Sequence, residues 1–363
     1  MELIMTLEQC LGAALMLLFL ADIFLTILYA RAGTGLLAPR WNRAMWAVLH
    51  GIANRSGTRR GTILSLAGPI IVVSLIGFWA IGLALGAALI VQPELGTAIR
   101  PSNGAASTDF VTSLLVAGNS LSIVGSGDYA PHTTATRLLF LMNSLIGASV
   151  LSLVLSYLVQ VYASLRERNA LALAVDLMSE GSGDAAVMLA RLMPDGEGSD
   201  ATSELGNLIR SLAATKEAHH FYPLLFYFRF EEPLYAVSRF TFILLDVTTL
   251  IETALDRRRY SALAKSAQVA SIHRGARMLL DTLNSSFPTT GDRADGAAEA
   301  WCLRQSYLAT TRTLARAGIA VQAEGAEAYI AARQEWETLV RRVAPILGYR
   351  MPDIDVRLNA PEP

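Results

Sequence analysis

Two long stretches without a charged side chain limit what this chain of 363 residues can fold into. The first covers residues 62–93, and the second lies between Arg137 and Arg166. Because a helix needs about 20 apolar residues to cross the hydrocarbon core of a bilayer, each stretch is long enough to span a membrane. A third candidate, residues 10–30, has Asp22 as its only charge. Hydrophobic residues make up 53% of the sequence and charged residues 17%, which is typical of a membrane protein with a soluble part.

The first candidate span lacks the pattern of a cleaved signal peptide. It follows Glu2 and Glu8 instead of Lys or Arg, its apolar stretch is long, and no small-residue cleavage site precedes a polar mature start. We therefore expect a retained membrane helix. An ionisable residue within a span is costly and usually faces protein or water. Asp22 is thus either a functional residue or a carboxyl group that is protonated or hydrogen-bonded to a neighbouring helix.

The connections between the spans differ in their arginine content. The first connection has no acidic residue and carries Arg31, Arg40, Arg43, Arg55, Arg59 and Arg60. The second carries Arg100 together with Glu94 and Asp109. Because basic connections stay on the cytoplasmic side, we expect the N-terminus outside and the C-terminus in the cytoplasm. Residues 41–52 have the pattern of a short amphipathic helix on the inner interface, although the two tryptophans in it fit packing against protein equally well.

A glycine-spaced loop lies between the second and third spans. Before it, Ser107, Thr108 and Asp109 are residue types that cap helix N-termini, and residues 110–120 have the length of one short apolar helix. Non-helical backbone at membrane depth is tolerated only where it lines a wet cavity or is buried in protein. Gly125 and Gly127 free the backbone to turn consecutive carbonyl groups toward one axis, where they would replace the hydration shell of an ion. The loop consists of Ser122, Ile123, Val124, Gly125, Ser126, Gly127 and Asp128.

Residues 109–162 resemble the pore helix, selectivity filter and inner helix of the tetrameric potassium-channel superfamily, whose filter reads T-V-G-Y-G-D. The matching residues are Ile123, Val124, Gly125, Ser126, Gly127 and Asp128. With residues 62–91 as the outer helix, the resemblance extends to both sides of the loop. It implies a homotetramer, because one chain supplies only one side of an ion cage. It also implies that K⁺ or Na⁺ binds the carbonyl oxygens of Ile123, Val124, Gly125 and Ser126.

Two residues depart from the filter of the family. Ile123 stands where the family has a threonine whose hydroxyl completes the innermost ion site, and Ser126 stands where it has a tyrosine. The aromatic residues that brace this tyrosine correspond to the aliphatic Leu115 and Val116. Because the packing behind a filter holds its carbonyl spacing, the resemblance predicts a looser filter with weaker discrimination between potassium and sodium.

The mouth and the inner helix have their own candidate residues. Asp128 keeps the family position, whereas the glutamate that often pairs with it corresponds to Asn119. Four copies of Asp128 would form an acidic ring that concentrates cations, or each carboxylate would cap the loop behind the filter. Residues 138–162 are expected to line the cavity and to form the gate at their C-terminal end. The candidate cavity and gate residues are Asn143, Ser144, Gly147 at the hinge position of the family, and Ser149.

The region after residue 163 is expected to be helical. Apolar positions recur at helical spacing in residues 170–178, 204–218, 235–255, 262–283, 297–317 and 324–347. Glycine and proline breaks fall at 181–183, 194–200, 287–288 and 291–296. This predicts a bundle of five to seven helices that continues from the inner helix. It differs from the α/β nucleotide-binding regulator common in the family, since neither its glycine fingerprint nor a P-loop is present.

Several weaker signals have ordinary explanations. Gly125-x-Gly127-x-x-Ala130 fits the dinucleotide fingerprint, but a proline follows at once and spans lie on both sides. His219, His220 and His273 lack the spacing of a metal site. The aromatic residues in 221–230 are expected to pack in a core or to line a pocket, and the arginines in 257–259 to be solvated or to face anionic lipid. The two cysteines, Cys10 and Cys302, predict no disulfide framework.

The predicted fold is an all-α membrane protein with three transmembrane helices, a re-entrant pore helix and filter, and a cytoplasmic helical bundle. The domains are the N-terminal helix with the amphipathic connection, the pore module, the helical regulatory domain and a flexible tail, at residues 1–61, 62–163, 164–350 and 351–363. The expected function is conduction of monovalent cations, potassium and also sodium, with a gate that the cytoplasmic domain controls. The alternative is a non-conducting membrane sensor or scaffold that reuses the pore fold.

The expected partners follow from this fold. They are membrane lipid, three further copies of the chain and an unidentified cytoplasmic ligand, without nucleic acid. No cofactor is expected besides the permeant K⁺ or Na⁺, and no enzyme activity, because no nucleophile, metal or phosphate-binding constellation stands out. The expected location is the cell membrane, as a multi-pass protein of a bacterial inner membrane.

Overall fold

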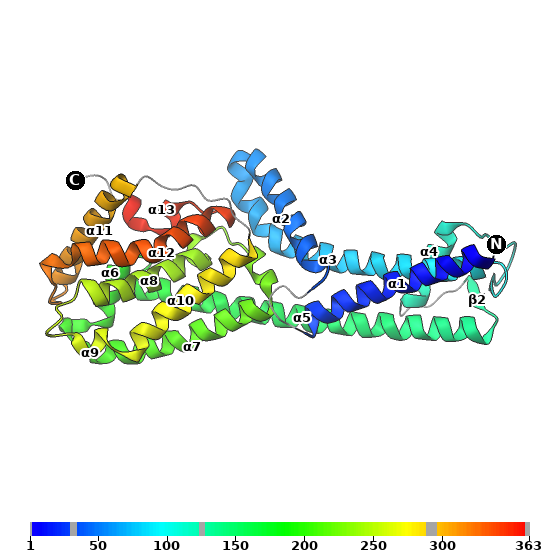
Figure 1. The fold of residues 1–363 in the computed structure, drawn as a ribbon, viewed down its shortest axis with the longest axis horizontal. Coiled ribbons are helices and arrows are strands. Elements are labelled where there is room, and N and C mark those ends of the chain that lie inside the picture. The colour runs from blue at the N-terminus through cyan, green and yellow to red at the C-terminus, as the bar shows by residue number, and fades with distance from the viewer. Residues whose placement is uncertain (1, 30–34, 123–127, 288–295, 360–363) are drawn as a thin grey trace. The chain divides into compact units, whose positions relative to one another are not determined.

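The computed structural model describes residues 2–29, 35–122, 128–287 and 296–359, and these residues are almost entirely helical (Figure 1). They contain one small antiparallel sheet of two strands, β1 (Ile99–Pro101) and β2 (Tyr129–Pro131). The chain divides into two compact units. The membrane unit comprises residues 1–45 and 69–161, and the helical unit comprises residues 46–68 and 162–363. The domain boundaries expected from the sequence stay a prediction.

Three helices are long and apolar enough to cross a membrane, namely α1 (Glu2–Ile27), α3 (Arg60–Val91) and α5 (Thr134–Met178). The all-α membrane fold is therefore confirmed. The amphipathic segment forms α2 (Ala38–Arg55), and α4 (Phe110–Leu121) lies between α3 and α5 in the sequence. Both α3 and α5 begin before the predicted ranges, and α5 continues without a break to Met178.

Small residues let α1 and α3 pack closely within the membrane unit. A side-chain carbon at Gly12 would collide with the backbone oxygen of Gly86, and one at Gly82 would overlap the ring of Phe19. In lipid, the hydrophobic effect does not drive helices together, because the lipid tails are as apolar as the helices. Helices there associate through close van der Waals packing, which small residues allow. The N-terminal helix therefore packs against α3 of its own chain.

The helical unit is a bundle built around one fully covered helix. Almost every residue of α8 is buried, and α8 packs against α6, α10 and α12. Besides the end of α5, the bundle consists of α6 (Ala185–Leu192), α7 (Ser199–Phe221), α8 (Val237–Thr253), α9 (Ser261–Ala264), α10 (Ala267–Ser286), α11 (Gly296–Arg316), α12 (Ala326–Ile346) and α13 (Met351–Ile354).

Three details of this unit differ from the sequence-based expectation. The helix expected over 262–283 is two helices, because the Ser266 hydroxyl caps α10 by accepting from the Val269 N–H. The short α6 was not predicted. The tail expected to be flexible instead forms helical turns over residues 351–359, since Ile354 and Asp355 are buried and Arg357 reaches buried carboxylates.

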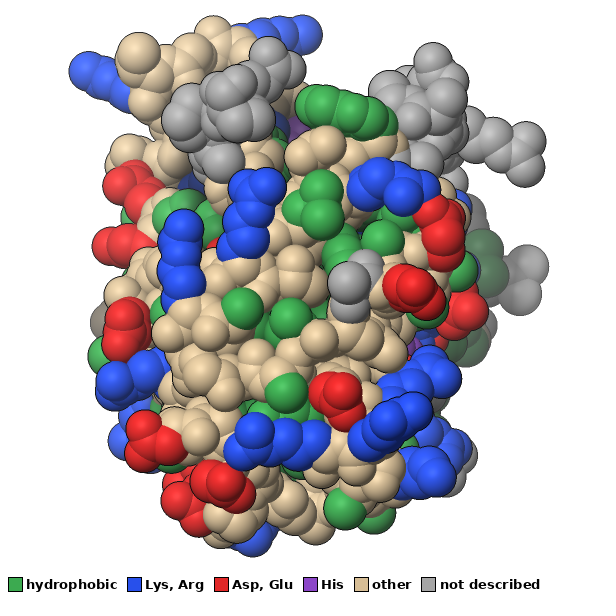
Figure 2. Space-filling model, turned by 90° about the vertical axis from the view of Figure 1, so that its left-hand side faces the viewer, with side chains coloured by type: hydrophobic (Ala, Val, Ile, Leu, Met, Phe, Trp, Pro, Cys, Tyr) green, Lys and Arg blue, Asp and Glu red, His purple; other side chains and the backbone are tan. Residues whose placement is uncertain are grey.

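The surface of the helical unit is that of a protein in water. In Figure 2, acidic and basic side chains are interspersed over the visible face, and apolar side chains form only small separate patches. The membrane helices expose large apolar side chains instead, among them Leu7, Leu17, Val73, Ile81, Leu141 and Val159. This contrast is what a bilayer around one unit and water around the other require.

Candidate functional site

Helix α4 is held at its start by a well-formed cap. The Asp109 carboxylate accepts from the backbone N–H of Thr112 at 2.9 Å and from its hydroxyl at 2.8 Å. The Ser107 hydroxyl donates to the same carboxylate. These donors, that of Ser107 first, hold the pKa of Asp109 well below its usual range. The cap predicted from the sequence thus stabilises the short helix that leads into the glycine-spaced loop.

The other end of α4 lies directly against α5. The Asn143 amide on α5 donates to the Ser120 hydroxyl at 2.9 Å, and both side chains are buried. One turn further along α5, a side-chain carbon at Gly147 would overlap the carbonyl oxygen of Leu121. Glycine at this position therefore lets the last turn of α4 touch the inner helix. A hinge role for Gly147 stays a prediction, since α5 is continuous through it.

The loop between α4 and β2 is fixed at both ends. Ile123, Val124, Gly125, Ser126 and Gly127 lie outside the described residues. On one side, Ser122 caps α4, with its hydroxyl donating to the Asn119 carbonyl at 2.9 Å. On the other side, Asp128 is exposed, and its carbonyl accepts from the Ser102 N–H at 2.7 Å.

The strand after the loop is tied back to the residues that precede α4. Strand β2 pairs with β1, with Ala130 opposite Arg100. The hydroxyl of Tyr129 accepts from the Ser107 N–H at 3.0 Å and donates to the Ser107 carbonyl at 3.2 Å. The cap of α4 and the exit of the loop therefore form one frame.

The remaining predicted residues lie in mixed surroundings. Leu115 and Val116 are the α4 residues that were expected to pack behind the loop. Val116 is buried, whereas Leu115 is 63% exposed. On α5, Ser144 and Ser149 are exposed and Asn143 is 1% exposed. The amide of Asn143 hydrogen-bonds Ser120 of α4 in this structure. That Asn143 lines a water-filled cavity stays a prediction.

Helix α5 is the least covered of the three spans. Only 11% of the most apolar 18-residue stretch of α5 is buried inside the chain, compared with 44% of the corresponding stretch of α3 and 28% of that of α1. Its exposed apolar side chains include Leu138, Leu141, Leu145, Leu151, Leu155 and Val159. One chain therefore does not complete the environment of this helix.

Asp22 is a buried carboxylate that accepts hydrogen bonds from neighbouring helices. It accepts from the backbone N–H groups of Leu37 and Ala38 at 2.7 and 3.2 Å, and from the Trp79 indole at 2.8 Å. The carboxylate on α1 thus caps the N-terminus of α2 and binds α3. Of the two interpretations left open by the sequence, the structure shows a hydrogen-bonded carboxyl that contacts neighbouring helices. A tryptophan inside an otherwise apolar span was the available signal for its partner.

The histidines do not form a metal site. Within the described ranges, no group of three His, Cys, Asp or Glu side chains could hold a metal ion. His219 is buried and hydrogen-bonds the Thr215 carbonyl through Nδ1 at 2.8 Å, and His273 contacts the Thr248 hydroxyl at 3.1 Å. Of the aromatic residues in 221–230, Phe226, Tyr227 and Phe228 are buried in the core, and Phe226 and Phe228 also line a small cavity.

Comparison with known proteins agrees with the geometry around α4. Residues 71–164 match a family model described as ion channel. The match begins in α3, includes α4 and the loop, and ends in α5. No curated protein and no solved structure matches the chain.

Proposed function

We propose that this chain, whose residues 71–164 match an ion-channel family model, belongs to the pore-loop cation channels and conducts monovalent cations as a homotetramer. The filter would be residues 122–128, with K⁺ or Na⁺ at the carbonyl oxygens of Ile123, Val124, Gly125 and Ser126. The observation that carries the proposal is the frame around this loop. Its two ends are fixed by the capped helix α4 and by the β1–β2 pair, as a backbone that must hold ion ligands requires.

The electrostatics of α4 support a cation site. The carbonyl end of a helix carries a partial negative charge, and in α4 this end is next to the loop at Leu121 and Ser122. Four copies would direct four such ends at one axis. Asp128, exposed on the other side of the loop, would add a ring of negative charge at the mouth.

Four chains would also cover the exposed side of α5. In a single chain, most of the apolar 18-residue stretch of the inner helix α5 is not buried. Neighbouring copies together with lipid would bury this stretch. In the proposed orientation, the N-terminus is outside and the helical unit is in the cytoplasm. The protein would be a multi-pass protein of the cell membrane, as in a bacterial inner membrane.

Selectivity and gating follow from residues that depart from the family. With Ile123 and Ser126 in the filter, we expect weak discrimination between potassium and sodium. The gate would lie toward the C-terminal end of the membrane part of α5, near Tyr162. Because α5 runs without a break to Met178, a change in the helical unit would bias the gate without a flexible joint.

The test is cation flux into liposomes that contain the purified full-length protein. We expect potassium and sodium to enter at comparable rates, and Gly125→Ala to abolish both. Gly77→Ala is the matched control, because Gly77 lies in α3 where an added side-chain carbon meets no neighbour.

Two outcomes would contradict the proposal. Absence of flux from a folded tetramer would favour a non-conducting sensor or scaffold. Flux that is unchanged by Gly125→Ala would place conduction outside the proposed filter. Strong preference for potassium would contradict only the selectivity.

A further inference from the structure

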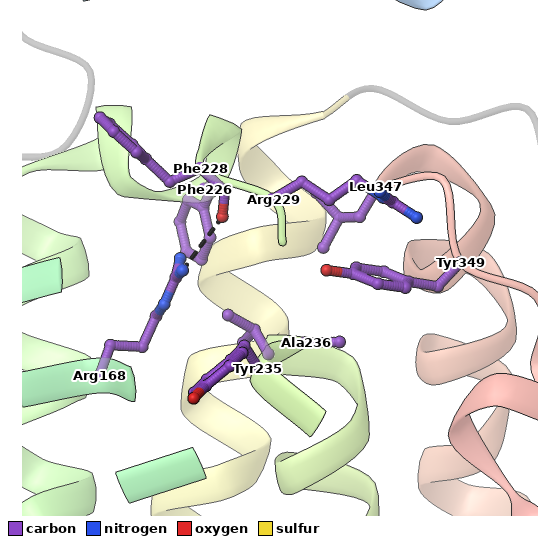
Figure 3. Close-up of a pocket in the computed structure, with 9 residues that line it drawn as sticks. Arg168, Phe226, Phe228, Arg229, Tyr235, Ala236, Leu347 and Tyr349 are labelled. Carbon is purple, nitrogen blue, oxygen red and sulfur yellow. Dashed lines mark hydrogen bonds between the residues drawn. The ribbon is translucent and has the colours of Figure 1, made fainter. Parts of the chain in front are cut away.

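The helical unit contains a small, partly open cavity beside the end of α5. It lies between Arg168 of α5, the 3₁₀ turn Pro223–Tyr227 with the residues after it, the start of α8 and the residues that follow α12 (Figure 3). Its volume is about 10 Å³, which is close to the space of one water molecule. The lining residues are Arg168, Phe226, Phe228, Arg229, Tyr235, Ala236, Val237, Leu347 and Tyr349.

Arg168 is a buried cation without a carboxylate partner in the described parts of the chain. It is 1% exposed, and it donates to the carbonyl oxygens of Leu225 at 2.8 Å and Phe228 at 3.0 Å. It also donates two longer hydrogen bonds to the Asn169 side-chain oxygen, at 3.4 and 3.3 Å. A guanidinium has five N–H groups, so these four bonds leave one Nη1 proton free. Burying such a charge without an opposite charge is costly.

A second arginine adds positive charge to the same cavity. Arg229 donates to the Gly61 carbonyl at 3.1 Å, and its guanidinium lies over the Tyr349 ring at 4.6 Å. Its Nε is buried and has no hydrogen-bond partner among the described residues. The carboxylates of Glu231 and Asp353 lie in the neighbourhood of Arg229, but neither forms an ion pair with it in the described structure. Figure 3 shows both arginines among apolar and aromatic side chains.

We propose that this cavity binds one small inorganic anion of the size of chloride, beside the Arg168 guanidinium. Water has the right size but leaves the charge of Arg168 uncompensated, whereas an anion compensates it. The small volume favours a monatomic anion over larger anions such as phosphate. The charge thus selects an anion, and the volume limits its size.

A neighbouring histidine provides an internal reporter of this site. His219 is buried, and its ring contacts Phe226 with 4.4 Å between centroids. Burial and the charge of Arg168 lower the pKa of His219 to about 3. A bound anion would offset part of the field of Arg168, so chloride is expected to raise the pKa of His219.

The cavity lies beside the parts of α3 and α5 that belong to the helical unit. Phe228 contacts the Tyr162 ring of α5 edge-on at 5.8 Å between centroids, and it packs against Gly68 of α3. The same turn supplies the carbonyl groups that Arg168 binds. An effect of the anion on gating rests on the proposed function, whereas binding of the anion does not.

Binding is tested by thermal unfolding of the purified full-length protein, in sodium chloride and in sodium gluconate at equal ionic strength. Chloride at about ten times its dissociation constant is expected to raise the melting midpoint by roughly 3 °C over gluconate. Arg168→Gln is expected to abolish the rise, and so is Ala236→Val, which fills the cavity and keeps both arginines. The matched control is Arg191→Gln, because Arg191 is exposed and its ion-pair partner within the described ranges is the exposed Glu180.

The outcome separates this inference from conduction. An equal midpoint in the two salts, a rise that persists in Ala236→Val, or a rise in phosphate but not in chloride would overturn the anion site. If Arg168→Gln does not fold, Ala236→Val and the His219 imidazole resonance in NMR decide the question. Loss of cation flux with an intact chloride response would contradict only the proposed function.

Discussion

The two units of the molecule each bury a carboxylate completely, and they stabilise it in opposite ways. Asp22 in the membrane unit and Asp246 in the helical unit are both 0% exposed. Asp22 accepts hydrogen bonds from two backbone N–H groups and an indole, and none of its partners among the described residues is a cation. Asp246 accepts from the Tyr329 hydroxyl and from Arg333 and Arg357.

The difference follows from what surrounds each unit. Between apolar helices, the N-terminus of α2 offers oriented N–H groups and a partial positive charge without a second ion to desolvate. In the helical unit, Arg333 also binds Glu337 at 2.7 Å and Asp355, which joins α8, α12 and the C-terminal turns. A buried ion network depends on every member, whereas a capped carboxylate depends on geometry more than on charge.

The largest effect is expected from breaking the network. Arg333→Met leaves Asp246, Glu337 and Asp355 buried without their common cation, and it is expected to destabilise the helical unit by about 3–5 kcal/mol. Thermal unfolding of the full chain measures the loss. Arg304→Met is the control, because Arg304 and Glu327 form an exposed pair whose loss should cost less than about 1 kcal/mol. Equal effects of the two variants would break the comparison.

A third way to bury a titratable group gives a pH dependence. His219 is buried neutral, with a pKa lowered to about 3 by burial and by Arg168. Below the ordinary pKa of 6.5, the His219 imidazole is protonated in the unfolded chain but stays neutral in the folded chain. The free energy of unfolding therefore falls as the pH decreases from about 6.5 toward 3. The expected total is a few kcal/mol, measured by denaturant unfolding at several pH values.

A variant isolates this contribution from that of other groups. His219→Gln should flatten the slope between pH 6.5 and 4, because glutamine does not titrate. His220→Gln, one position along α7 on a less buried side chain, should leave the slope unchanged. A slope that survives His219→Gln would assign the pH dependence to the carboxylates of the ion network.

Charge removal distinguishes the two carboxylates directly. Asp22→Asn keeps one oxygen acceptor for the N–H donors of α2, but its amide nitrogen cannot accept from the Trp79 indole, and we expect a loss of about 1–2 kcal/mol. Asp246→Asn removes the buried charge that Arg333 and Arg357 share, which leaves the network with fewer carboxylates for its cations, and it should cost more. Thermal unfolding compares them, and a greater loss in Asp22→Asn would reverse our interpretation.

The smallest effect concerns a single hydrogen bond. Trp79→Phe removes the indole donor to Asp22 but keeps most of the packing, and it should cost about 1 kcal/mol. Hydrogen exchange at the Leu37 and Ala38 amides reports whether the cap of α2 survives. Protection is expected to persist in Trp79→Phe and to be lost in Asp22→Ala.

Sequence patterns predicted most of the helices but did not identify the distant residues that hydrogen-bond the buried charged side chains. The three spans, the cap at Asp109 and most helix breaks follow from local rules, and the structure contains them. The partner of Asp22 is 57 residues away, and Arg168 meets its carbonyl acceptors across a similar distance. Local periodicity contains no information on such pairs. The filter residues 123–127 lie outside the described structure, so their roles stay proposals.

The frame around the loop has a consequence for how this segment tolerates change. Tyr129 is bound to Ser107, and β2 is in register with β1, while Ser122 is held by the end of α4. Adding or deleting one residue between Ser122 and Tyr129 would have to be accommodated within the loop between its two fixed ends, or it would shift β2 by one position and turn its side chains to the opposite face. Substitutions leave this register intact. The loop can therefore vary in composition, as Ile123 and Ser126 do, more readily than in length.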